Sequence, residues 1–429
     1  MKLILGYGRS GQAVARVLKE RGERAYVSDL VEKKEGIFPD FSYVWGEHPL
    51  WLLEKVEEII VSPSIPYDSP FILEAKKRNI KIISEIEWAM QQLGGIKLGI
   101  TGTNGKSTTT SMIAHIFNEA GIRAISAGNI GTPLSSFVKE QSFEVYSIEI
   151  STFQLESMSL KLLDGAIVLN VTPDHIDRHQ TFENYKNLKK KIFQLLKEGG
   201  VGVAPKGLFP ELKLFRYGNE KDCELIMDME NLIYKGEVVL NRRDLSLLGD
   251  HNWENAAGAV LLALKMGIQK DRIAPALKTF KPLEHRMEVV DTFQGITFIN
   301  DSKGTNVDSV LKALTGVPLK KTVLILGGKD KGSDFSPLKD IVERVCKVVY
   351  CIGDAREKIF SALEGISVPI YSLRGLEEVF LSLDSVLEEK DYVLLSPGCA
   401  SFDQYANFEE RGKHFKELVR IWKERKSQI

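Results

Sequence analysis

The stretch Gly99-Ile100-Thr101-Gly102-Thr103-Asn104-Gly105-Lys106-Ser107-Thr108 decides the fold of the central part of this chain. Residues 97–101 read as a short buried strand, and the residues after the stretch have helical periodicity, with an apolar face formed by Met112, Ile113, Ile116 and Phe117. Glycines let backbone N–H groups turn toward an anion, and the positive end of a helix adds to that attraction. The stretch therefore predicts a phosphate-binding loop between a strand and a helix.

Three side chains in this loop suit a bound nucleotide. Lys106 can reach the β- and γ-phosphates, and Ser107 or Thr108 can bind Mg²⁺. Ile100 stands where the common P-loop pattern has glycine, so the loop is a shortened variant. The alternative is a glycine-rich turn with a chance lysine. The order of strand, Gly-Lys-Ser and helix favours phosphate binding.

Two polar segments downstream can complete a metal site. Residues 146–150 read as a strand that carries Glu149, and a carboxylate at the end of a neighbouring strand is where a phosphate-bound Mg²⁺ needs a ligand. Residues 166–170 read as another strand, followed by the turn Asp174-His175-Ile176-Asp177. His175 could ligate a second metal ion, contact a substrate or be a bystander.

Three consecutive lysines, Lys189, Lys190 and Lys191, lie on a predicted helix. Its apolar stripe consists of Tyr185, Leu188, Ile192, Leu195 and Leu196. Lys190 and Lys191 are expected on a solvated face. Lys189 lies beside the stripe, where an ammonium needs a partner or a modification, or else extends its head to water.

The chain as a whole alternates short apolar runs with amphipathic helical stretches, which is typical of parallel α/β sheets. Its 429 residues suffice for two or three domains. We expect an α/β protein with a Rossmann-like N-terminal domain (1–93), a central P-loop-type ATPase domain (94–281) and a Rossmann-like C-terminal domain (282–429). Further expected strands are 2–5, 25–28, 322–326, 348–352 and 392–395, with an antiparallel stretch at 223–239 and a final helix over 408–423.

Composition excludes several classes. The formal net charge of −1, with acids and bases interspersed, argues against a protein held on nucleic acid by bulk positive charge. No two of the four cysteines have C-x-x-C spacing, so neither a metal site nor a disulfide framework is expected of Cys223, Cys346, Cys351 and Cys399. The first apolar run is broken at Gly6 and Gly8, too early for a signal peptide, and no later run reaches the length of a membrane span. We expect a cytoplasmic monomer without membrane insertion.

The N-terminus carries a second glycine pattern. Gly6-x-Gly8-x-x-Gly11 follows the first strand, and Asp29 ends the next one, as in dinucleotide-binding folds. Taken alone the pattern suggests NAD(P). It encodes a tight turn and phosphate access rather than nicotinamide chemistry, and the chain has a complete phosphate loop but no evident hydride-transfer site.

Together these motifs resemble the Mur ligases. The resemblance rests on the Gly-Thr-Asn-Gly-Lys-Ser-Thr loop, Glu149, the Asp-His-Ile-Asp turn and the lysine helix. Two further stretches carry it: Gly249-Asp250-His251-Asn252-Trp253-Glu254-Asn255, and His285-Arg286 followed by the run from Asn300 to Asn306. It extends over all three expected domains, in order.

Within this family the chain is similar to the members that add D-glutamate to UDP-N-acetylmuramoyl-L-alanine during peptidoglycan precursor synthesis. The motifs are Ser62-Pro63, the run Gly327 to Phe335, and Leu394 to Tyr405, which reads Leu-Leu-Ser-Pro-Gly-Cys-Ala-Ser-Phe-Asp-Gln-Tyr. Ser64 and Gly304 depart from the family pattern, which usually has glycine and alanine there. The alternatives are a family member for another amino acid, a folylpolyglutamate synthetase, a nucleotide-driven switch, or a non-catalytic dinucleotide-binding protein.

The resemblance implies roles for named residues. ATP phosphates and Mg²⁺ would be held by Gly102, Thr103, Asn104, Gly105, Lys106, Ser107 and Thr108, and ATP also by Asn255, Arg286 and Asp301. Metal ligands would be Ser107, Glu149, His175 and Lys189, with two Mg²⁺ ions and with Lys189 carbamylated by CO₂. The catalytic set would be Lys106, Glu149, His175 and Lys189.

The two other substrates have their own implied residues. The UDP-sugar would meet Arg9, Ser10, Asp29, Ser62, Asn129 and Gln154. D-Glutamate would meet Thr305, Lys331, Ser401 and Phe408. The implied reaction phosphorylates a carboxylate of the UDP-sugar peptide with ATP, and the amine of the amino acid then displaces phosphate.

Overall fold

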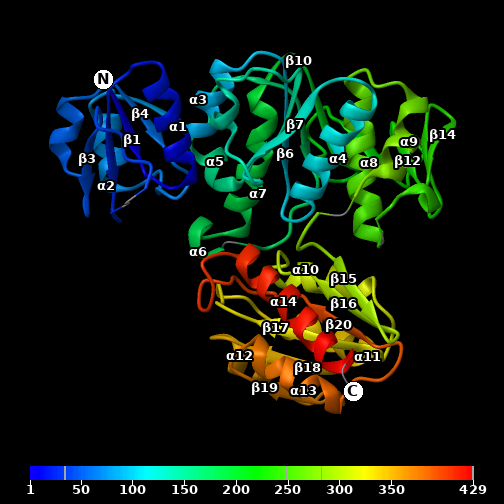
Figure 1. The fold of residues 1–429 in the computed structure, drawn as a ribbon. Helices are drawn as coiled ribbons and strands as arrows, with labels where there is room; N and C mark the ends of the chain where they lie inside the picture. The colour runs from blue at the N-terminus through cyan, green and yellow to red at the C-terminus, as the bar shows by residue number, and fades with distance from the viewer. Residues whose placement is uncertain (33–34, 175, 248, 282, 428–429) are drawn as a thin grey trace. The chain divides into compact units, whose positions relative to one another are not determined.

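The structure is a computed structural model that describes the chain except residues 33–34, 175, 248, 282 and 428–429, and except the side chains of residues 176 and 177. Three separate β-sheets carry the fold, and helices accompany each of them, which confirms the α/β prediction (Figure 1). By packing, the chain forms two compact units. The first comprises Met1–Val171, Glu183–Leu245 and Glu254–Phe280, and the second comprises Thr172–Phe182, Ser246–Trp253 and Lys281–Ile429. The domain boundaries at residues 93 and 281 stay predictions.

The N-terminal sheet has five parallel strands in the order β3-β2-β1-β4-β5. The β1 and β4 strands are buried on both faces, as expected of the centre of a parallel sheet. The elements are β1 (Lys2–Leu5), α1 (Arg9–Glu20), β2 (Ala25–Asp29), β3 (Ser42–Trp45), η1 (Leu50–Glu54), β4 (Glu58–Val61), α2 (Pro70–Lys77), β5 (Lys81–Ser84) and α3 (Glu85–Gln92).

The middle sheet has nine strands in the order β14-β13-β12-β11-β10-β9-β6-β8-β7. It is parallel from β7 to β12 and antiparallel from β12 to β14, which confirms the irregular stretch predicted at 223–239. The elements are β6 (Ile96–Thr101), α4 (Lys106–Glu119), β7 (Ala124–Gly128), η2 (Leu134–Phe137), β8 (Val145–Glu149), α5 (Thr152–Ser157), β9 (Leu163–Val168), α6 (Ile176–His179), α7 (Phe182–Lys190), η3 (Lys191–Leu195), β10 (Leu196–Pro205), β11 (Phe215–Gly218), β12 (Leu225–Met227), β13 (Asn231–Tyr234), β14 (Glu237–Asn241), η4 (Arg242–Asp244), α8 (Asp250–Lys265), η5 (Lys270–Arg272) and α9 (Ile273–Thr279).

The C-terminal sheet has six strands in the order β15-β16-β20-β17-β18-β19, parallel except for the antiparallel edge strand β15. The long helix α14 packs Phe415, Val419 and Trp422 into the core on one face. The elements are β15 (Glu288–Phe293), β16 (Ile296–Asn300), α10 (Val307–Thr315), β17 (Thr322–Gly327), η6 (Ser336–Leu338), α11 (Lys339–Val345), β18 (Cys346–Ile352), α12 (Arg356–Ala362), β19 (Ile370–Ser372), α13 (Leu376–Ser382), η7 (Leu383–Ser385), β20 (Tyr392–Leu395) and α14 (Phe408–Ser427).

The lysine helix is shorter than predicted. Its α-helical part ends at Lys190, a 3₁₀ turn follows, and Leu196 already belongs to β10. Lys190 pairs with Glu211 at the surface as expected. The prediction of a solvated Lys191 was wrong. Its Nζ donates to the carbonyl oxygens of Leu155 and Glu156, because the tighter turn directs the side chain inward.

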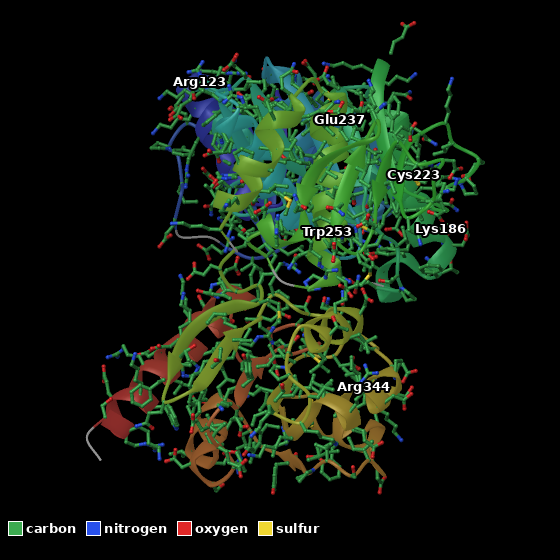
Figure 2. The ribbon with its side chains drawn as sticks, turned by 90° about the vertical axis from the view of Figure 1, so that its right-hand side faces the viewer. Arg123, Lys186, Cys223, Glu237, Trp253 and Arg344 are labelled. Atoms are coloured by element: carbon green, nitrogen blue, oxygen red, sulfur yellow. The ribbon has the colours of Figure 1, made fainter. Side chains whose placement is uncertain are left out.

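All four cysteines are buried free thiols; Cys223, which precedes β12, is labelled in Figure 2. Burial raises the pKa of the Cys346, Cys351 and Cys399 thiols to about 12, which keeps them protonated and unreactive. In the part of the chain that the structure describes, no helix is both long and apolar enough to cross a membrane.

A buried carboxyl on α3 fastens this helix to the middle sheet region. Glu85 Oε1 accepts a hydrogen bond of 2.9 Å from the backbone N–H of Ser135, at the start of η2. Burial is the largest influence on this group and raises the pKa of Glu85 above its ordinary value, against the opposing effect of the Ser135 hydrogen bonds. A carboxyl with a raised folded-state pKa stabilises the fold fully below its unfolded pKa, and this contribution is lost as the pH rises through the folded-state value.

Glu85→Gln should therefore flatten the pH dependence of stability. The amide keeps an acceptor for Ser135 but never ionises, so the melting temperature of the wild type should fall more steeply than that of the variant between about pH 5 and about pH 8. Scanning calorimetry across this range measures the difference. Glu119→Gln, at an exposed position on α4, serves as the control, and its melting temperature should change with pH as that of the wild type does. Parallel curves for Glu85→Gln and wild type would contradict the prediction.

Candidate active site

The predicted phosphate loop lies between the buried strand β6 and the helix α4. Gly105 caps the helix at φ 82°, a left-handed conformation that favours glycine. A Cβ at this position would lie 2.1 Å from Oδ1 of Asn255, so the loop also needs glycine there for space. The structure thus brings Asn255, predicted as an ATP contact, against the phosphate loop.

The side chain of Lys106 lies along the loop. Its Nζ donates to the carbonyl oxygens of Gly102 at 2.8 Å and Thr103 at 2.7 Å. An ammonium held at the loop by backbone carbonyls is positioned to meet the phosphates of a nucleotide that the loop would bind.

Asn170 fixes the loop from the end of β9, a contact that the sequence prediction did not include. Its Oδ1 accepts from the N–H of Asn104 at 2.9 Å, its Nδ2 donates to the carbonyl of Asn104 at 3.0 Å, and its backbone carbonyl accepts from Thr103 N–H. The signal was available, since Asn170 ends a predicted strand next to the loop.

The oxygen atoms at the head of α4 suit a hard cation. Ser107 Oγ donates to Glu149 Oε2 at 2.6 Å, and Asn129 Nδ2 donates to Glu149 Oε1 at 2.7 Å. Glu149 is 1% exposed. The neighbouring Thr108 Oγ1 is buried and has no hydrogen-bond partner among the residues described. A carboxylate and hydroxyls beside a phosphate loop fit Mg²⁺, which prefers oxygen ligands.

Lys189 is buried beside this loop, only 1% exposed, so the alternative in which its head reaches water is wrong. Its Nζ donates to the carbonyl of Gly102 at 2.8 Å and lies 4.5 Å from the centroid of the Tyr185 ring. The Tyr185 hydroxyl in turn contacts Thr103 Oγ1 at 3.1 Å. His175, predicted as a metal ligand, lies outside the described residues.

The residues predicted to bind the UDP group lie at the carboxyl ends of parallel strands, where open α/β sheets bind ligands. Asp29 ends β2 and accepts from the N–H groups of Val31 at 2.9 Å and of Tyr7. Ser62 follows β4, and its Oγ donates to the carbonyl of Gly6 at 2.8 Å. Arg9 and Ser10 begin α1, directly after the glycine turn.

Two other residues predicted to meet the UDP-sugar have structural partners. Asn129 donates to Glu149, as described above. Gln154 forms a capping box with Ser151, so its side-chain oxygen accepts from Ser151 N–H at 2.9 Å. The geometry places Asn129 at Glu149, the predicted metal ligand, and Gln154 at the head of α5.

In the second compact unit, a constrained turn presents Arg286. His285 and Met287, on either side of it, have φ angles of 63° and 45°, left-handed values that non-glycine residues seldom adopt. Arg286 Nε is buried, and among the described residues it has no hydrogen-bond partner. Such a turn, held against its backbone preference, is typical of a functional site.

Asp301 lies beneath this turn. Its Oδ1 accepts from Met287 N–H at 3.2 Å and its Oδ2 from Ser396 Oγ at 2.8 Å. Burial raises the pKa of Asp301 to about 6, although the nearby Arg286 charge and these hydrogen bonds lower it. Both residues were predicted to contact ATP, and the structure brings them together.

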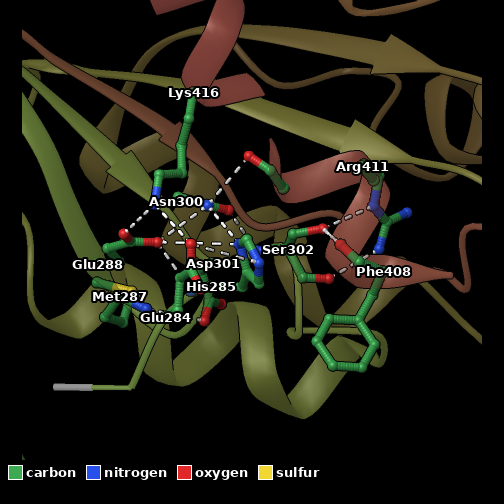
Figure 3. Close-up of polar contacts among 11 residues, drawn as sticks. Glu284, His285, Met287, Glu288, Asn300, Asp301, Ser302, Phe408, Arg411 and Lys416 are labelled. Atoms are coloured by element: carbon green, nitrogen blue, oxygen red, sulfur yellow. Dashed lines mark hydrogen bonds and ion pairs between the residues drawn. The ribbon is translucent and has the colours of Figure 1, made fainter. Parts of the chain in front are cut away.

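A hydrogen-bond network holds the turn in place (Figure 3). Asn300 Nδ2 faces three acceptors: His285 Nδ1 at 2.9 Å, Glu288 Oε2 at 3.2 Å and the carbonyl of Gly412 at 3.3 Å. Since Asn300 Oδ1 accepts from Ser302 N–H, the amide orientation is fixed and His285 Nδ1 must be an acceptor. Burial lowers the pKa of His285, which agrees with a neutral ring.

The side chains of Glu284, His285 and Glu288 are close enough to hold a metal ion. However, Lys416 Nζ bonds both carboxylates, at 2.7 Å from Glu284 Oε1 and 2.7 Å from Glu288 Oε1 (Figure 3). The lysine supplies the positive charge that the two glutamates require, so we interpret this cluster as a structural ion-pair network rather than a metal site.

The residues predicted to bind the amino acid follow strands of the C-terminal sheet. Ser401 is buried and comes after β20, Thr305 after β16 and Lys331 after β17. Phe408 begins α14, and the Lys303 ammonium lies 5.2 Å from the centroid of its ring.

Asp174, from the Asp-His turn, belongs to the same compact unit. It accepts from Asn306 Nδ2 at 3.1 Å and lies 3.9 Å from Lys331 Nζ. This contact joins the turn to a residue predicted to bind the amino acid, and sequence spacing gave no sign of it.

Three family models match the chain in succession. They are described as the Mur ligase MurD-like N-terminal domain over residues 1–84, the Mur ligase middle domain over 100–263 and the Mur ligase glutamate ligase domain over 285–399. Among solved structures, the UDP-N-acetylmuramate-alanine ligase MurC of Thermotoga maritima has a TM-score of 0.64 at 18% identity, covering 98% of this chain and 99% of that one. The MurF ligase of Thermotoga maritima, in complex with ADP, has a TM-score of 0.66 at 14% identity, covering 99% of this chain and 95% of that one. At these identities the likeness concerns the fold.

Sequence relatives are nearer. A UDP-N-acetylmuramoylalanine--D-glutamate ligase of Koribacter versatilis (strain Ellin345) is 37% identical, covering 97% of this chain and 96% of the relative. A protein of the same name from Alkaliphilus oremlandii (strain OhILAs) is 36% identical, covering 97% of each chain. With the phosphate loop, the Ser107–Glu149 pair and the three sheets in the order of the matched domains, these full-length similarities show that the chain belongs to the Mur ligase family.

Proposed function

We propose that this chain is the ATP-dependent ligase that adds D-glutamate to UDP-N-acetylmuramoyl-L-alanine in peptidoglycan precursor synthesis. The observation that carries the proposal is the identity of 36–37% with relatives of that name over 97% of the chain. The middle sheet supports the nucleotide part, because its phosphate loop joins a buried lysine, a buried carboxylate and hydroxyl groups. As an enzyme that consumes ATP and a UDP-linked sugar, it would act as a monomer in the cytoplasm.

The chemistry requires activation of a carboxylate. The carboxylate oxygen of the alanyl group attacks the γ-phosphorus of ATP, the bond to the bridging oxygen breaks, and ADP leaves. The amine of D-glutamate then attacks the acyl phosphate carbon, loses a proton and displaces inorganic phosphate, leaving an amide. The protein aligns the reactants and offsets negative charge, for which Lys106 and the first turn of α4 are positioned.

Ser107 and Glu149 would hold Mg²⁺, which supplies charge neutralisation at the phosphates when it is bound. Their oxygens already lie 2.6 Å apart. Asn129 would hold the second oxygen of Glu149 in place. Asn255, which lies against Gly105, would contact ATP. Arg286 and Asp301 would also contact ATP.

Lys189 would serve a second Mg²⁺ as a carbamate, together with His175. The neutral amine attacks CO₂, a N–C bond forms, one C–O π pair moves to oxygen, and a proton is released. The product is an anion in place of a cation. The burial of Lys189 supports this step, because removal from water favours the neutral form of an amine over the charged form.

The function is tested by phosphate release from ATP. We expect turnover only when ATP, Mg²⁺, UDP-N-acetylmuramoyl-L-alanine and D-glutamate are all present, since the acyl phosphate needs the first three and its consumption needs the fourth. Omitting each component in turn shows which of them the reaction requires. Replacing D-glutamate by L-glutamate, L-lysine or glycine identifies the amino acid that the enzyme accepts. Equal turnover with L-glutamate, or turnover without any acceptor, would reject the proposal.

Lys106→Ala should lower kcat by at least about 100-fold, in line with the loss of a preorganised charge at a transition state. The side chain serves a ligand rather than a core, so the melting temperature should stay close to that of the wild type. Lys139→Ala, which removes only a surface pair with Glu20, is the matched control. Near-normal turnover by Lys106→Ala would mean that the loop is structural.

Lys189→Ala should be nearly inactive and partly rescued by small carboxylates such as formate or acetate, because they can replace the missing anion. Mass spectrometry under CO₂-saturated, non-acidic conditions should find the added carboxylate on Lys189. Lys190→Ala, at the neighbouring surface lysine, should behave as the wild type with and without formate. Activity of Lys189→Ala without added carboxylate would exclude the carbamate role.

A further inference from the structure

Arg411 on α14 is a buried cation that none of the steps above uses. It is 1% exposed and is the largest side chain buried to this degree among the described residues. In the part of the chain that the structure describes, no carboxylate lies within ion-pair distance of its guanidinium. A buried charge without a paired carboxylate is costly, so a fold retains it only where it contributes something else.

Among the residues that the structure describes, the guanidinium donates only to neutral oxygen atoms. Its Nε donates to Ser302 Oγ at 3.0 Å and its Nη2 to the Ser302 carbonyl at 2.9 Å and the Cys399 carbonyl at 3.1 Å. Its Nη1 donates to the Ala400 carbonyl at 3.2 Å and, more weakly, to the Gly327 carbonyl at 3.5 Å. Figure 3 shows the part of this network that joins Arg411 to Ser302 and Phe408.

These acceptors follow, or end, three neighbouring strands. Ser302 comes after β16, Cys399 and Ala400 after β20, and Gly327 ends β17, and these strands are adjacent in the order β16-β20-β17. The carboxyl ends of adjacent parallel strands form the edge at which α/β sheets bind ligands. Arg411 therefore fastens three loops at that edge with one rigid, planar group.

The residues that would bind D-glutamate are near these anchor points along the chain. Thr305 is three residues after Ser302, Lys331 is four after Gly327, and Ser401 is next to Ala400. Phe408 is connected through space, since its carbonyl accepts from Ser302 Oγ at 2.8 Å, the same hydroxyl that accepts from Arg411. A displacement of the guanidinium would thus disturb all four positions.

The guanidinium also keeps its charge. Burial lowers the pKa of Arg411 to about 10, which is still well above neutrality. No carboxylate pairs directly with this charge, although Asp301 and Asp403 lie near enough to stabilise it, so the guanidinium adds a positive contribution to the potential at the edge of the sheet, where a low dielectric screens it weakly. Such a potential favours a ligand with two carboxylates over one with a single carboxylate.

We propose that Arg411 is the positioning residue of the acceptor subsite: it holds the loops that carry Thr305, Lys331 and Ser401, and its charge favours an amino acid with a second carboxylate. This inference rests on the proposed function, because it takes D-glutamate as the acceptor. Arg411 acts through the loops and through its field, without touching the substrate.

Two substitutions separate the contributions. Arg411→Lys keeps the charge but loses the planar fork, and Arg411→Met loses both. We expect kcat/KM for D-glutamate to fall about tenfold in Arg411→Lys and at least about 100-fold in Arg411→Met, with KM for ATP and for the UDP-sugar peptide unchanged within about twofold. Exchange of labelled ADP into ATP, which needs only acyl phosphate formation, should persist without D-glutamate in both variants.

The matched control is Phe415→Leu, one turn along the same helix and in the core beneath it. It should lower the melting temperature while kcat/KM for D-glutamate stays as in the wild type. Equal increases of KM for all three substrates in the Arg411 variants, or D-glutamate kinetics that match those of Phe415→Leu, would overturn the proposal. An identical loss in Arg411→Lys and Arg411→Met would also overturn it, since the charge would then contribute nothing.

If Arg411→Met does not fold, Arg411→Lys is compared with the wild type alone. A higher KM for D-glutamate with an unchanged KM for ATP then supports the proposal, and equal changes in both KM values overturn it. A wild-type enzyme that does not turn over D-glutamate would reject the proposed function itself, before any variant is measured. The two failures are therefore distinguishable.

Discussion

The carbonyl oxygen of Gly102 accepts hydrogen bonds from two lysines, Lys106 at 2.8 Å and Lys189 at 2.8 Å. This shared acceptor holds the predicted phosphate loop in place, because it joins the head of α4 to α7, two helices separated along the chain by three strands. Two further hydrogen bonds hold the loop: the Tyr185 hydroxyl contacts Thr103 Oγ1, and the Asn170 side chain accepts from Asn104 N–H. A small movement of the loop would therefore displace both lysine side chains and the Ser107–Glu149 pair together.

Much of the architecture could be predicted from the sequence. Short apolar runs and glycine turns placed most of the individually predicted strands to within about two residues, because a buried parallel strand needs an unbroken apolar run. The predictions were weaker where tertiary packing decides. The stripe from Tyr185 to Leu196 predicts one helix. In the structure the α-helix gives way to a 3₁₀ turn at Lys191, and Leu196 begins β10, because pairing in the sheet competes with helix formation there. Periodicity alone cannot express that competition.

The site was predictable to a similar extent. The residue types for phosphate and Mg²⁺ could be named from Gly105, Lys106 and Ser107, because loop and helix are contiguous in sequence. The contacts made by Asn129 and Asp174 could not be predicted, since each depends on which segments of the chain become neighbours in the fold. Gln154 and Asn129 illustrate the same limit, because each side chain was expected at a substrate and is engaged by the protein itself.

Gly412 has a consequence for how this chain can change over time. A Cβ there would lie 2.2 Å from His285 Nδ1, so the imidazole ring occupies the space of a missing side chain. The two positions are size-matched, and a larger residue at 412 becomes tolerable only after the ring at 285 has become smaller. Such a pair is expected to change in a fixed order, with the loss of the ring first. Without the ring, the turn that presents Arg286 would lose its hydrogen bond to Asn300 and keep those to Glu288 and Asp301, so the intermediate step would weaken the turn.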